Sequence, residues 1–120
     1  MQMGKSRDPL ILMVGKLVEQ GGGHGLLVSP NDVMARYRAD YLCDRLHKHE
    51  IPFTFNRMDM VVEIECLGVT IRCWSLQRLE NRVQGLELQE LVDESTAVRK
   101  LTEREWYTMN TVRCRVRERR

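Results

Sequence analysis

Two kinds of hydrophobic spacing alternate along this chain, and their order limits the folds that it can form. Residues 7–23 place apolar side chains three and four positions apart, which predicts an amphipathic helix that a glycine triplet ends. Residues 24–30 are a short apolar run closed by a proline, which predicts a buried strand. Residues 31–50 return to helical spacing, with Asn31 and Asp32 as candidate capping residues.

The second half of the chain begins with strand-type spacing. Residues 53–75 alternate apolar and polar side chains on either side of Gly68, which predicts a β-hairpin. A polar link, residues 76–85, leads to a short apolar strand within residues 88–96. The polar pair at positions 89 and 90 interrupts this strand, and we therefore expect a shortened strand or one at the edge of a sheet.

The chain closes with a last helical segment. Residues 102–113 have helical spacing, and Thr102 with Glu105 three positions later forms a capping-box signature. The full order is helix, strand, helix, hairpin, loop, strand, helix. Such alternation predicts a three-layer α/β fold, a sheet with flanking helices and an inserted hairpin.

Length and composition favour one domain. The chain has 120 residues, of which 42% are hydrophobic and 30% charged, with a net charge of +2. Four cysteines and three histidines occur in no metal-ligand or disulfide-framework spacing. The longest apolar run, residues 10–14, is too short for a membrane span or a signal sequence. We expect a soluble cytoplasmic protein without membrane contact.

The basic end of the chain stands apart from this near-neutral average. Five arginines lie there against the single acid at position 118, namely Arg113, Arg115, Arg117, Arg119 and Arg120. The segment is either a solvated terminus or a patch that contacts phosphates. We therefore divide the chain into a domain, residues 1–112, and a basic tail, residues 113–120.

The large side chains of the helical segments are expected to lie in the core. On the second helix the apolar residues at helical spacing are Val33, Tyr37, Tyr41, Leu42 and Leu46. Trp74, Trp106 and Tyr107 lie in apolar patterns, so we assign them to core packing and not to base stacking.

Three residues ahead of the first helix suggest phosphate chemistry. In Gly4, Lys5 and Ser6, backbone N–H groups at a helix N-terminus can cradle phosphates, the lysine can reach the terminal ones, and the hydroxyl can bind Mg²⁺. The complete motif has another glycine five positions earlier, and only three residues precede Gly4 here. The short motif alone is compatible with a phosphate-binding loop and with chance.

An acidic pair ends the last predicted strand. Asp93 and Glu94 are either a solvated turn or the carboxylates that hold Mg²⁺ and polarise a water in an NTPase. Strand tips and helix N-termini meet at one end of parallel α/β layers. We therefore expect Lys5, Ser6, Asp93 and Glu94 to converge.

Several segments together resemble a known family, the ATPase (P-loop) domain of the tailed-phage terminase large subunit, which drives DNA into the capsid. The similar stretches are GKS, GLLVSPND, GVTIRCWS, RVQGLELQELVDES and LTEREWYTMNTVRCRV, and they span most of the chain. The strand before the phosphate-binding loop, the later coupling motif and the nuclease domain have no counterpart, so the resemblance implies an incomplete P-loop domain truncated at both ends.

The resemblance also implies a set of roles and partners. Gly4, Lys5, Ser6 and Arg7 would contact the phosphates of ATP, Ser6 and residue 93 would bind Mg²⁺, and residue 94 would be the catalytic carboxylate. The partners would be double-stranded DNA, a terminase small subunit or portal protein, and an oligomer or complementing chain. The location would be the cytoplasm of the host cell.

Two other interpretations stay open at this point. The chain could be a non-catalytic phage or prophage protein that keeps a degenerate P-loop fold and binds DNA or a protein partner through its basic end. Alternatively, it could be a generic α/β domain in which the GKS and Asp-Glu sequences occur by chance.

Overall fold

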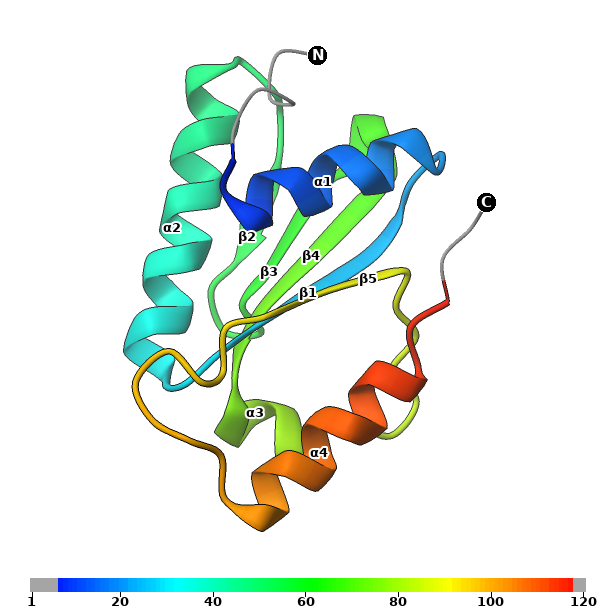
Figure 1. Ribbon diagram of the computed structural model, residues 1–120. Coiled ribbons are helices and arrows are strands. Elements are labelled where there is room, and N and C mark those ends of the chain that lie inside the picture. Colours follow the sequence, from blue (N-terminus) through cyan, green and yellow to red (C-terminus); the bar gives the residue numbers. More distant parts are fainter. Residues whose placement is uncertain (1–6, 118–120) are drawn as a thin grey trace.

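The computed structural model describes residues 7–117, which form a five-stranded mixed sheet with flanking helices (Figure 1). This α/β architecture is confirmed, and each predicted element occurs in the predicted order, with two further elements between them. The elements are α1 (Pro9–Glu19), β1 (Gly23–Ser29), α2 (Asp32–Lys48), β2 (Thr54–Asn56), β3 (Val61–Ile64), the 3-10 turn η2 (Glu65–Leu67), β4 (Val69–Ser75), α3 (Leu76–Glu80), β5 (Glu90–Asp93) and α4 (Glu103–Cys114).

The strands follow the order β2-β3-β4-β1-β5 across the sheet. Strand β1 is parallel to both β4 and β5, whereas β2, β3 and β4 form an antiparallel meander. The predicted hairpin is confirmed, and Gly68 at its turn has a φ of 66°, a backbone angle that glycine adopts readily. Sequence prediction missed β2 and the short helix α3, which lies within the segment expected to be a polar link.

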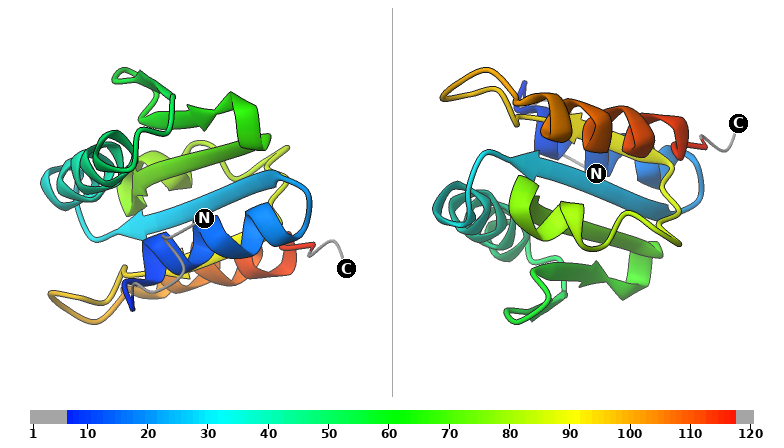
Figure 2. Two further views of the ribbon diagram at one scale, coloured as in Figure 1. Left: turned by 90° about the horizontal axis from the view of Figure 1, so that it is seen from above. Right: turned by 90° about the horizontal axis from the view of Figure 1, so that it is seen from below.

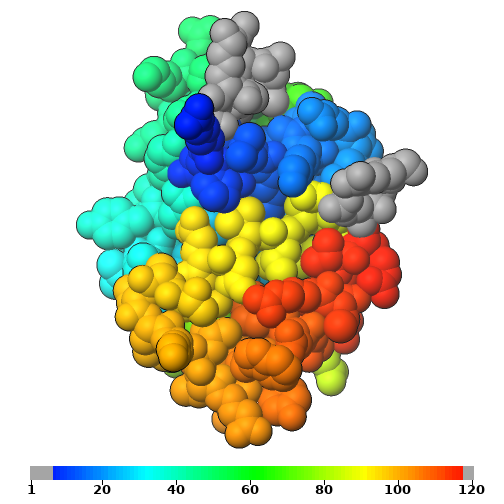
Figure 3. Space-filling view, viewed as in Figure 1, coloured from blue at the N-terminus to red at the C-terminus, as the bar shows by residue number. Residues whose placement is uncertain are grey.

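The prediction that the strand with the polar pair is short and at an edge is confirmed. Strand β5 has four residues and is the last strand of the sheet in the described part of the chain. Gln89 and Glu90 are nevertheless buried, and hydrogen bonds offset the cost of removing their polar atoms from water. Gln89 Oε1 accepts from the backbone N–H of His24 at 2.6 Å, and Glu90 Oε2 accepts from Gln20 Nε2 at 2.9 Å. In the space-filling view this region (yellow) lies between α1 and α4 (Figure 3).

The helices cover the sheet from two sides. Figure 1 shows α1 and α2 on one side and α3 and α4 on the other. Figure 2 shows α1 in front in the view from above and α4 in front in the view from below, over the same end of the sheet. A methyl group on Gly25 would lie 2.9 Å from Met13 Sδ, so α1 packs closely on this strand.

The buried face of α2 agrees only in part with the predicted one. Val33 and Tyr37 are 66% and 70% exposed, so their assignment to the core is wrong. The helix buries the two predicted leucines together with two alanines that the prediction did not include, namely Leu42, Leu46, Ala35 and Ala39. Alanine side chains let the helix backbone approach the sheet, whereas spacing alone pointed to the larger apolar residues.

The aromatic predictions have a mixed outcome. Trp74 is buried and donates from Nε1 to the backbone oxygen of Asp59 at 2.7 Å, which confirms its core position. Trp106 and Tyr107 are 52% and 60% exposed, so their core assignment is wrong. Their rings pack edge to face with centroids 5.4 Å apart, and the buried residues of α4 are Met109 and Val112.

The start of α4 confirms the predicted capping box. Thr102 Oγ1 accepts from the N–H of Glu105 at 3.2 Å, and Glu105 Oε1 accepts from the N–H of Thr102 at 2.9 Å. Across residues 7–117, no helix combines the length and the apolar character needed to cross a bilayer.

Candidate functional site

The carboxyl ends of three parallel strands lie at one edge of the sheet. Ser29 of β1 pairs with Ser75 of β4, and Val28 pairs with Asp93 of β5. Ligands of open α/β sheets bind outside such an edge. The Ser29 hydroxyl is buried here without a hydrogen-bond partner in the described structure, which leaves polar capacity for a ligand or water.

The start of α1 is joined to this edge through one arginine. Arg38 of α2 donates from Nη1 and Nη2 to the two carboxylate oxygens of Asp8, at 2.9 Å and 2.6 Å. Its Nε lies 3.0 Å from Oε1 of Glu94 as an ion pair, although the geometry is not that of a hydrogen bond. Arg38 therefore connects α1, α2 and the end of β5.

Asp8 has two functions at this junction. Besides binding Arg38, its Oδ1 accepts from the N–H of Leu10 at 2.8 Å and so caps α1. The hydrogen bond from Arg38 is the main cause that lowers the pKa of Asp8, against the opposing effect of burial. The same hydrogen bond raises the pKa of Arg38, so both groups stay charged at neutral pH.

Asp93 has a different set of partners. One carboxylate oxygen accepts from the backbone N–H of Ser95 at 2.9 Å and from its hydroxyl at 2.5 Å. The other forms an ion pair with Arg113 of α4. Asp93 is thus tied to the helix that covers one side of the sheet.

The two acidic side chains point to opposite sides of the sheet. The N–H of Glu94 donates to the backbone oxygen of Val28 at 2.9 Å, so the strand ladder continues through both residues. Successive side chains of a strand alternate between faces, which explains why Glu94 meets α2 and Asp93 meets α4. Across residues 7–117, no group of three His, Cys, Asp or Glu side chains is arranged to hold a metal.

The predicted site residues are only partly covered by the structure. Gly4, Lys5 and Ser6 lie outside the described residues, whereas Arg7 is exposed immediately before the α1 cap. The described structure brings the start of α1 and Glu94 together through Arg38, which sequence reasoning missed. A local signal existed for one member of this group, because an aspartate before a proline is typical of a helix start.

Residues 113–117 of the basic end of the chain are described by the structure. Arg113 belongs to α4, and the N–H of Arg117 donates to the backbone oxygen of Leu88 at 2.6 Å. Val116 forms a parallel bridge with Leu88. Arg119 and Arg120 lie outside the described residues.

The protein is thus an α/β domain in which ion pairs hold the two acidic side chains at the carboxyl ends of the parallel strands. Comparisons with protein families, with curated proteins and with solved structures found no match for the chain.

Proposed function

We propose that this chain is part of the ATPase core of a DNA-packaging motor of the terminase type. One observation carries the proposal: Arg38 joins the capped start of α1 to Glu94 at the tip of β5. The GKS sequence directly precedes this start. In an ATPase site the phosphate-binding loop lies at a helix start and the catalytic carboxylate at a strand tip, so these two parts must lie close together.

The roles of the residues follow from their chemistry. Lys5 and the backbone N–H groups of the GKS sequence would bind the phosphates of ATP, and Arg7 is close in sequence. The Leu10 N–H of α1 is already used by the Asp8 cap. Ser6 and Asp93 offer hydroxyl and carboxylate oxygens, the ligand types that Mg²⁺ prefers, and the bound ion would neutralise phosphate charge. Glu94 would orient and polarise the attacking water, with Arg38 as its positioning residue.

The same geometry sets one condition for magnesium binding. Asp93 is held by Arg113 on the α4 side of the sheet, opposite to Glu94, so its carboxylate must leave this arginine and turn toward the start of α1 before it can bind the ion. The ion pair is partly exposed, since 47% of the Arg113 side chain is accessible, and exchange should therefore cost little.

The proposed partners come from the resemblance alone. They are double-stranded DNA as the substrate that is moved, and a terminase small subunit or portal protein. Because β5 lies at the edge of the described sheet, further strands of an oligomer or of a complementing chain could pair with it.

One observation favours a second candidate, a non-catalytic protein with a degenerate P-loop fold that binds DNA or a protein. Each carboxylate of the acidic pair already has an arginine partner, Arg113 for Asp93 and Arg38 for Glu94. Such pairing would stabilise a fold in which neither acid takes part in catalysis.

Thermal unfolding with and without Mg-ATP tests the first candidate. A ligand at 100 times its Kd stabilises the folded state by about 2.7 kcal/mol, which raises Tm by several degrees. We expect Lys5→Ala to abolish this rise and Lys16→Ala, on the exposed side of α1, to keep it. A rise that both variants retain equally would contradict the proposed phosphate site.

The rate of ATP hydrolysis distinguishes the proposed roles of Asp93 and Glu94. Glu94→Gln should abolish ATP hydrolysis but preserve the Mg-ATP thermal shift, because it removes the charge that polarises water and not the phosphate contacts. Asp93→Asn should weaken the magnesium-dependent part of that shift. If the wild-type chain binds no nucleotide while it still binds DNA, the second candidate replaces the first.

A further inference from the structure

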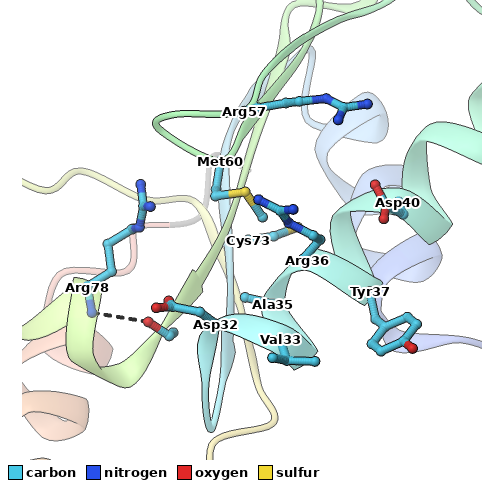
Figure 4. Close-up of a pocket in the computed structure, with 11 residues that line it drawn as sticks. Asp32, Val33, Ala35, Arg36, Tyr37, Asp40, Arg57, Met60, Cys73 and Arg78 are labelled. Atoms are coloured by element: carbon cyan, nitrogen blue, oxygen red, sulfur yellow. Dashed lines mark hydrogen bonds between the residues drawn. The ribbon is translucent and has the colours of Figure 1, made fainter.

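A cavity lies at the carboxyl edge of the sheet, between the start of α2 and the end of β4. Its volume is about 550 Å³, within the range of small-ligand sites. Figure 4 shows side chains from α2, from the turn between β2 and β3, and from α3 around it. Asp8, Glu94 and Arg113, which form the ion pairs described above, are not among the residues that line it.

Three arginines of this cavity come from three different elements. Arg36 belongs to α2, Arg57 to the β2–β3 turn and Arg78 to α3. Arg57 lies over the Phe55 ring at 6.0 Å, and Arg78 donates to the backbone oxygen of Met58 at 2.7 Å. These contacts orient two of the guanidinium groups without neutralising them.

None of the three arginines forms an ion pair with a described carboxylate. Five other arginines do so, namely Arg38, Arg82, Arg99, Arg104 and Arg113. Asp32 and Asp40 also line the cavity, so carboxylates are available nearby and are not used. The arginines therefore keep donors for an anionic ligand.

The charge of the cavity selects the kind of anion. Three arginines against Asp32 and Asp40 leave one net positive charge. A triphosphate carries several negative charges in one place, whereas each phosphodiester of a nucleic acid carries one. The inner wall contains the buried side chains of Ala35, Met60 and Cys73, an apolar surface suited to a sugar ring.

We propose that this cavity binds the sugar–phosphate backbone of DNA, through Arg36, Arg57 and Arg78. The choice of DNA rests on the proposed function, in which the chain acts on DNA. The arrangement provides a phosphate site that is separate from the α1 start and from the basic end of the chain.

The salt dependence of DNA binding tests this proposal. Binding of a fluorescent 20-base-pair duplex is measured by anisotropy between 50 and 200 mM salt, conditions chosen because phosphate contacts dominate there. Each lost contact reduces the slope of log K against log salt by about 0.9, so Arg36→Gln/Arg57→Gln should reduce it by about 2. Arg82→Gln/Arg104→Gln, which also removes two arginines but outside the cavity, is the matched control and should leave the slope nearly unchanged.

Two further measurements make the result specific. The charge-preserving variant Arg36→Lys/Arg57→Lys should retain most of the slope, and the Gln variant should keep the Mg-ATP thermal shift. Equal slopes for the wild type and the Gln variant would overturn the proposal. It would also be overturned if Mg-ATP displaced the duplex and the Gln variant lost the Mg-ATP shift, because the cavity would then be a nucleotide site. Failure of the ATPase proposal appears separately, as the absence of that shift in the wild type.

Discussion

Replacing Arg38 should loosen three elements at once. The side chain is 20% exposed and makes two hydrogen bonds to Asp8 and one ionic contact with Glu94. Exposed ion pairs contribute up to about 1 kcal/mol, whereas removing one partner of a fully buried pair costs about 3–5 kcal/mol. For this intermediate burial we expect Arg38→Gln to reduce the free energy of unfolding by about 2 kcal/mol, or roughly 6–10 °C in Tm.

A double-mutant cycle isolates the contact with Asp8. Asp8→Asn keeps an oxygen that can cap α1 but removes the charge, so its loss of stability reports mainly on the ion pair. The coupling energy between Arg38→Gln and Asp8→Asn, measured by urea unfolding, should be about 1–2 kcal/mol. Arg36→Gln, exposed on the same helix, is the control and should change stability by less than about 0.5 kcal/mol.

The pH dependence of stability is an independent test of the ion pair between Arg38 and Asp8. Because Arg38 lowers the pKa of Asp8 in the folded state, the stabilisation is complete above the unfolded pKa of about 3.9 and is lost as the pH falls through the folded pKa. The difference in stability between wild type and Arg38→Gln should therefore be larger at pH 6 than at pH 2. A coupling energy near zero together with a pH-independent difference would refute the reasoning.

Three further predictions concern other parts of the molecule. Gly25→Ala should cost about 1–3 kcal/mol in urea unfolding, because the new methyl group would lie 2.9 Å from Met13 Sδ. Arg113→Gln should strengthen magnesium-dependent ATP binding, measured by thermal shift, since it frees Asp93; weaker binding would contradict the proposed release step. Burial raises the pKa of Cys43 to about 11 and that of Cys73 to about 12, so at pH 8 a thiol reagent should modify both more slowly in the folded protein than after unfolding.

Local patterns were sufficient for most of the fold. The turn at Gly68 and the capping box of Thr102 and Glu105 are determined by nearby residues, and the structure confirms them. The helical period of α2 was also visible, but the face that it buries was not. Spacing pointed correctly to Leu42 and Leu46 but also to Val33 and Tyr37, which are exposed. The full extent of the buried face depends on where the sheet lies, which is tertiary information.

The contacts of the candidate site were beyond the reach of sequence patterns. Arg38 and Asp8 are 30 positions apart, and Arg113 and Asp93 are 20 apart. With 19 lysines and arginines in the chain, no local rule identifies which one meets which acid. The order of strand and helix predicted that Asp93 and Glu94 lie at the sheet edge, but their arginine partners depend on how α2 and α4 pack.

The one-sided pairing of β5 has a consequence for its stability. Within the described structure this four-residue strand pairs along its length with β1 alone, and the bridge from Val116 reaches only Leu88 ahead of it. Short strands with a single neighbour open by local unfolding at lower free energy than central strands, so the amide hydrogens of β5 should exchange with solvent before those of β1. Asp93 ends this strand and Glu94 follows it directly. Local unfolding of β5 would therefore also displace the acidic pair from the positions described above.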